Sequence, residues 1–140
     1  MMIKQRIILI PILLIACLLF FVSTVFAHEI RPAIATATFN KDGSYEIKVV
    51  ANFEILLAGI GPVHKDTNAS PEAKNYNTLR ALPADQLTKK IEEYGPRWMS
   101  GVEVIFNGIR VVPNIKRIEV PRVGDLDMPR LSNVFLVGRA

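Results

Sequence analysis

Two histidines are the residues of this chain whose type and position suit metal chemistry. Cleavage after Ala27 would leave His28 with a free α-amino group, and that nitrogen and the imidazole together suit Cu(II) in a tetragonal, nitrogen-rich site. His64 is a candidate third nitrogen ligand, and Glu29 and Asp66 are candidate oxygen ligands. Copper and nickel are therefore the metals to consider. The competing interpretation of either histidine is a solvated or hydrogen-bonded side chain without a ligand.

The first 27 residues have the pattern of a secretory signal peptide. A positively charged start is followed by an apolar stretch, Ile7–Val22, and Val25 and Ala27 occupy the −3 and −1 positions of a cleavage site. Cleavage would export residues 28–140 as one extracytoplasmic domain, in the periplasm or an equivalent compartment. The sequence therefore says more about location than about chemistry.

Two alternatives for this segment stay open. The 21 residues Ile7–Ala27 carry no charge, and at about 1.5 Å per residue they are long enough to cross a bilayer as an uncleaved anchor. Cys17 also fits the lipidated cysteine of a lipoprotein signal. Each alternative still places residues 28–140 outside the cytoplasm, and an anchor would add contact with the membrane.

The composition of residues 28–140 limits the function. Loss of Lys4 and Arg6 lowers the formal charge from +4 to +2. A charge so close to neutral does not indicate a nucleic-acid partner. Loss of Cys17, the single cysteine, leaves 113 residues that must be held together by an apolar core. No nucleophile elbow, zinc-protease motif or phosphate-binding loop is present, so we expect a protein that is not an enzyme.

Alternating apolar and polar residues predict strands at 33–39 and 45–55, joined as a hairpin by the turn-forming residues 40–44. Residues 56–83 contain Gly59, Gly61 and Pro62 and are predicted to be mostly loop.

From residue 84 the period changes to that of a short amphipathic helix of about three turns, with a stop at Gly95-Pro96. Asn107-Gly108 then predicts a tight hairpin over 102–112, and further strands are expected at 115–120 and 131–137. This set of predicted elements favours a mainly β fold. We expect a small antiparallel Ig-like β-sandwich of about six to seven strands with one short helix. Strand 131–137 is predicted to be an unpaired edge, open to a partner strand or to further chain at its C-terminal side.

Several segments resemble a known family. Ala27-His28-Glu29-Ile30-Arg31-Pro32-Ala33, directly after the signal segment, is similar to the start of the extracytoplasmic N-terminal domain of HupE/UreJ-like membrane proteins. Leu79–Leu82, the helix, and Gly101–Pro113 resemble the later part of that domain. The likeness covers most of residues 27–120.

The resemblance implies a link to nickel or related metal uptake. In that family the domain precedes several transmembrane helices, which residues 28–140 do not contain. The expected function is therefore a binding or accessory domain that works with a separately encoded multi-helix membrane protein. The alternatives are a small copper- or nickel-binding protein that uses His28, and a structural domain that pairs through an exposed edge strand.

Overall fold

The computed structural model describes residues 32–64, 66–126 and 128–140, so the predicted signal segment and His28 lie outside it. Its first strands, β1 (Ile34–Phe39) and β2 (Ser44–Ala51), form an antiparallel hairpin. The turn is closed by the N–H of Ser44, which donates to Oδ1 of Asp42 at 3.0 Å, and Gly43 takes a φ of 81°. The predicted hairpin at the start of the domain is confirmed.

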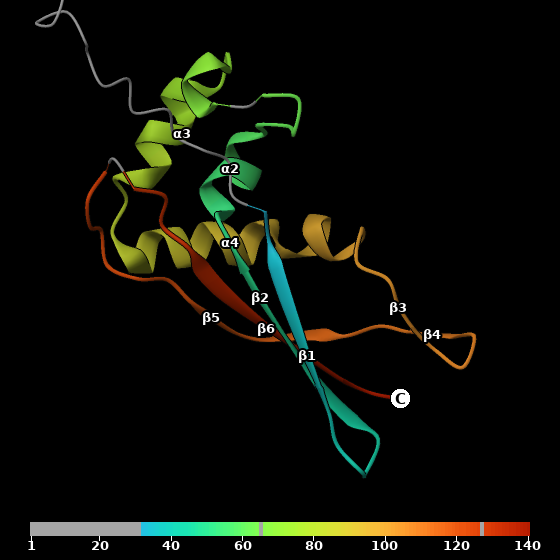
Figure 1. The fold of residues 1–140 in the computed structure, drawn as a ribbon. Helices are drawn as coiled ribbons and strands as arrows, with labels where there is room; N and C mark the ends of the chain where they lie inside the picture. The colour runs from blue at the N-terminus through green and yellow to red at the C-terminus, as the bar shows by residue number, and fades with distance from the viewer. Residues whose placement is uncertain (1–31, 65, 127) are drawn as a thin grey trace, which may run out of the picture.

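Strands β5 (Asn114–Glu119) and β6 (Ser132–Arg139) complete a four-stranded antiparallel sheet in the order β1-β2-β6-β5 (Figure 1). The prediction that residues 131–137 form an unpaired edge is therefore wrong, because β6 pairs with β2 on one side and β5 on the other. Val134, Phe135 and Leu136 are all buried. A continuous apolar run of this kind is typical of a strand that is buried on both faces.

The segment after β2 is more helical than predicted. The strand expected to reach residue 55 ends at Ala51, and helix α2 (Phe53–Ala58) begins at once. The reason is Asn52, whose Oδ1 accepts the N–H of Ile55 at 3.2 Å and caps the helix. The expected loop also contains the short helix η1 (Thr67–Ala69) and helix α3 (Ala73–Arg80). Together α2 and α3 gather at one end of the sheet, opposite the β1–β2 turn (Figure 1).

Helix α4 (Ala84–Met99) is present but longer than predicted, at 16 residues. It continues through Gly95-Pro96. Pro96 has no N–H to donate to the carbonyl of Glu92, but Glu92 is exposed, so water can hydrogen-bond to that carbonyl instead. The last turn is held by Trp98, whose ring stands edge-on to Phe53 at 5.3 Å between centroids.

A second, two-stranded sheet consists of β3 (Val104–Phe106) and β4 (Ile109–Val111). Asn107 and Gly108 form its turn with φ values of 48° and 82°, as the sequence predicts for a two-residue hairpin loop. Phe106 connects this hairpin to the larger sheet, because its ring packs against Phe39 at 5.4 Å and Tyr45 at 5.3 Å.

The main core lies between α4 and one face of the four-stranded sheet. Leu87 and Ile91 of the helix are buried against Val134 and Leu136 of β6. The predicted mainly β class with antiparallel sheets is confirmed, together with a few helices in place of one. Among the residues that the structure describes, a helix rather than a second sheet packs on this core face, so the Ig-like sandwich is not confirmed.

Candidate functional site

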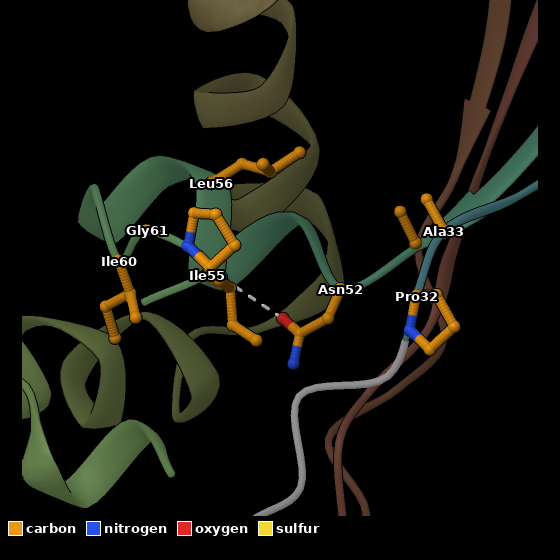
Figure 2. Close-up of a pocket in the computed structure, with 9 residues that line it drawn as sticks. Pro32, Ala33, Asn52, Ile55, Leu56, Ile60 and Gly61 are labelled. Atoms are coloured by element: carbon orange, nitrogen blue, oxygen red, sulfur yellow. Dashed lines mark hydrogen bonds between the residues drawn. The ribbon is translucent and has the colours of Figure 1, made fainter. Parts of the chain in front are cut away.

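An apolar pocket of about 220 Å³ lies where β1 begins and β2 passes into α2 (Figure 2). Its lining comes from three parts of the chain, the start of β1, the β2–α2 junction and the turn after α2. These residues are Pro32, Ala33, Ala51, Asn52, Ile55, Leu56, Ile60, Gly61 and Pro62. The pocket is therefore built by the segments that join the helical end of the molecule to the sheet.

Two local structures hold the pocket walls in place. At the start of α2, the Asn52 amide caps the helix through Oδ1 and donates from Nδ2 to the Tyr76 hydroxyl at 2.9 Å. At its end, Gly59 adopts a left-handed conformation, and the N–H of Ile60 donates to the carbonyl of Ile55 at 3.1 Å. That C-terminal cap turns Ile60 and Gly61 back alongside α2, across the pocket from Pro32 and Ala33 at the start of β1 (Figure 2).

The pocket is apolar and has no groups for catalysis. Its lining has no acid, base or nucleophile, and the amide of Asn52, its one polar side chain, is already engaged by Ile55 and Tyr76. Pockets that enclose a drug-sized ligand or cofactor usually measure about 300–1,000 Å³, which is larger than this one. A single bulky apolar side chain is a better match in size and polarity.

Two buried charges, Glu54 and Arg130, do not line the pocket, and their role is structural. Nε of Arg130 donates to Oε1 of Glu54 at 2.7 Å, with side chains 8% and 0% exposed. The same guanidinium donates to the carbonyls of Leu82 at 3.0 Å and Leu79 at 3.3 Å, where α3 ends and its dipole favours a cation. Every one of these contacts points into the protein, so the ion pair anchors the loop before β6 to the helices.

A second arginine anchors the same loop. Arg80 is 4% exposed, lies over the Tyr76 ring at 5.2 Å, and donates from Nη2 to the carbonyl of Met128 at 2.9 Å. Burial raises the pKa of the Tyr76 hydroxyl, against a smaller lowering by its hydrogen bond with Asn52. The resulting polar cluster is closed to solvent and supports the pocket without lining it, apart from Asn52.

Sequence reasoning did not find this cluster, because it placed Asn52 and Glu54 on the polar side of a long strand. The local signal was present: Asn52 directly precedes the mostly apolar segment Phe53–Ala58, with Glu54 in its first turn, and asparagine in that place is a favoured helix N-cap. No local signal could have paired Glu54 with Arg130, since 76 positions separate them.

The predicted metal ligands are not brought together in the part of the chain that the structure describes. His28 and Glu29 lie outside it. His64 is half-buried in the turn after α2, where its N–H donates to the carbonyl of Gly61 at 3.3 Å, and the carboxylate of Asp66 caps the N–H of Asn68 at 2.9 Å. Over residues 32–64, 66–126 and 128–140, no group of three His, Cys, Asp or Glu side chains could hold a metal ion.

Comparison of the chain with protein-family models, with curated proteins and with solved structures finds no match. Within the described ranges, the helices are all too short or too polar to span a bilayer.

Proposed function

We propose that this protein is an exported, non-enzymatic binding domain, an accessory module of a HupE/UreJ-like membrane system linked to metal uptake. The processed chain would begin at His28 and work in the periplasm or an equivalent compartment. Its start motif and its Gly101–Pro113 hairpin support the family proposal. The second sheet of an Ig-like architecture would extend from β3 and β4, which already contact the larger sheet through Phe106.

The observation that carries the binding role is the apolar pocket at the start of β1. Its volume of about 220 Å³ and its aliphatic walls suit a single bulky side chain. We propose that an extracytoplasmic loop of a separately encoded multi-helix membrane protein supplies that side chain. Burial of one large aliphatic or aromatic side chain contributes about 1.5–3 kcal/mol, enough to position a partner that is also held by other contacts.

Site-specific photo-crosslinking in the cells that make the protein tests this role. Pro62 is exposed and lines the pocket, so p-benzoylphenylalanine at position 62 should form an adduct with an integral membrane protein. The same amino acid at Lys41, in the β1–β2 turn at the opposite end of the sheet, is the positional control.

A matched pair of glycine substitutions makes the test specific to the pocket. Gly61 lines it and Gly124 does not, and a Cβ added at either position meets no atom within 4 Å. Gly61→Trp should fill the pocket and abolish the adduct, whereas Gly124→Trp should leave it unchanged. An adduct that survives Gly61→Trp, or one that contains only soluble proteins, would refute the proposed function.

A further inference from the structure

Within the described residues, the outer edge of β1 presents unpaired backbone groups. The N–H of Asn40 donates to the carbonyl of Ser44 at 2.9 Å, which marks this pair as hydrogen-bonded in the β1–β2 ladder. Because bonded and non-bonded pairs alternate in an antiparallel ladder, the N–H and C=O groups of Ala35, Ala37 and Phe39 point away from β2. In the described part of the chain, no strand pairs with that edge.

The two edges of the sheet differ in protection. Strand β5 carries Lys116, Arg117 and Glu119 and a register shift between residues 115 and 117, all of which discourage pairing with another strand. Strand β1 has no charge, no proline and no bulge, and all six of its residues are exposed. An edge of that kind is a ready template for another strand.

The side chains of β1 are complementary to those of a second, antiparallel copy. Its two large apolar side chains, Ile34 at 61% exposed and Phe39 at 60%, lie at opposite ends and on opposite faces of the strand. Between them stand only alanine and threonine. A two-fold axis at Thr36 places Phe39 opposite Ala33 of the second copy and Ile34 opposite Thr38, a large residue against a small one each time.

We propose that two copies of this chain pair through β1 into one continuous eight-stranded antiparallel sheet, with the two-fold axis at Thr36. In that register the free groups of Ala35 meet those of Ala37 from the second copy, so the outward backbone donors and acceptors are satisfied. The uncharged strand brings no like charges together along the ladder. This dimer does not depend on the proposed membrane partner, which is assigned to the pocket.

Disulfide trapping tests the register with a matched control. In a background with Cys17→Ser, Thr36→Cys should cross-link under mild oxidation, because the two residues at the axis form a non-bonded pair with Cα atoms about 4.5 Å apart. Thr38 has the same residue type, face and exposure. Thr38→Cys should stay monomeric on a denaturing gel, because its copies would stand about 14 Å apart along the strands.

Light scattering of the exported protein supplies the second measurement. Wild type should have twice the chain mass, Ala37→Lys should reduce it to the monomer, and Asn114→Lys on the protected edge should leave the dimer intact. A monomeric wild type, equal cross-linking of both cysteine variants, or an edge occupied by a different protein or by the chain's own N-terminal segment would overturn the proposal.

Discussion

Tyr45 lies directly across from Gly138 in the β2–β6 ladder, and its ring occupies the space where a side chain at position 138 would stand. The Tyr45 side chain is buried beneath Phe39 and Phe106, with centroids at 6.4 and 5.3 Å. Its burial raises the pKa of the hydroxyl. The glycine therefore allows one aromatic cluster to join β1, β2 and the β3–β4 hairpin.

Gly138→Ala should destabilise the domain by about 1–3 kcal/mol, because the added methyl group overlaps the Tyr45 ring and forces the ring or the strand to move. Urea unfolding followed by circular dichroism measures the change. Gly124→Ala is the control, since its Cβ meets nothing within 4 Å and should change stability by less than about 0.5 kcal/mol. Equal effects from both variants would contradict the proposed contact.

Arg130→Met should destabilise by about 3–5 kcal/mol, since it leaves the carboxylate of Glu54 buried without its cation. The double variant Glu54→Gln with Arg130→Met should be more stable than Arg130→Met alone, because the uncompensated charge is gone. Lys116→Met, which breaks an exposed ion pair with Glu46, should cost less than about 1 kcal/mol. A double variant no better than the single one would show that packing, not charge, dominates at Arg130.

Alkaline pH should weaken the fold through Tyr76. Burial raises the pKa of its hydroxyl above the unfolded value of 10.0, so the folded state holds the proton more tightly than the unfolded state does. This contribution is full below about pH 10 and is lost as the pH rises through the folded-state pKa. In Tyr76→Phe, the unfolding free energy should decrease less steeply above pH 10, and the remaining decrease should be due to Tyr45. At neutral pH it should cost about 1–3 kcal/mol, because Nδ2 of Asn52 loses its acceptor. An unchanged alkaline slope would contradict this account.

Intact mass spectrometry of the exported protein should give a mass that begins at His28. Val25 and Ala27 fit the −3 and −1 positions that signal peptidase requires. A mass that begins at Met1 would indicate an anchor, and a lipidated Cys17 would indicate a lipoprotein. In either case His28 would have no free α-amino group with which to bind a metal.

Calorimetric titration with Cu(II) and Ni(II) separates the metal-binding alternative from the accessory role. A site built on the processed N-terminus should lose its binding heat in His28→Ala and keep it in His64→Ala. The reason is that the terminal amine and the His28 imidazole are the primary nitrogen ligands of such a site, whereas His64 is a candidate third ligand. Equal heats from the two variants and wild type would exclude an ordered site at His28.

Local patterns predicted those parts of the fold that neighbouring residues determine. Alternation over 33–39 and 45–51 predicted the first hairpin, and Asn107-Gly108 predicted the second because positive φ is required at both positions. The patterns failed where two local signals competed. Asn52 continued the alternation of a strand but also capped a helix, and the helix formed because Phe53 and Ile55 could be buried against other parts of the chain.

The sequence by itself determined the predicted export signal, the positions of most strands and the amphipathic face of α4, since each depends on residue order over one short segment. Only the tertiary structure decided that β6 is central, that Glu54 is buried with Arg130, and that β1 and β5 are the edge strands of the sheet within the described residues. These features depend on contacts between residues far apart in the chain. Strand order is set by which apolar faces are buried together, and no short segment contains that information.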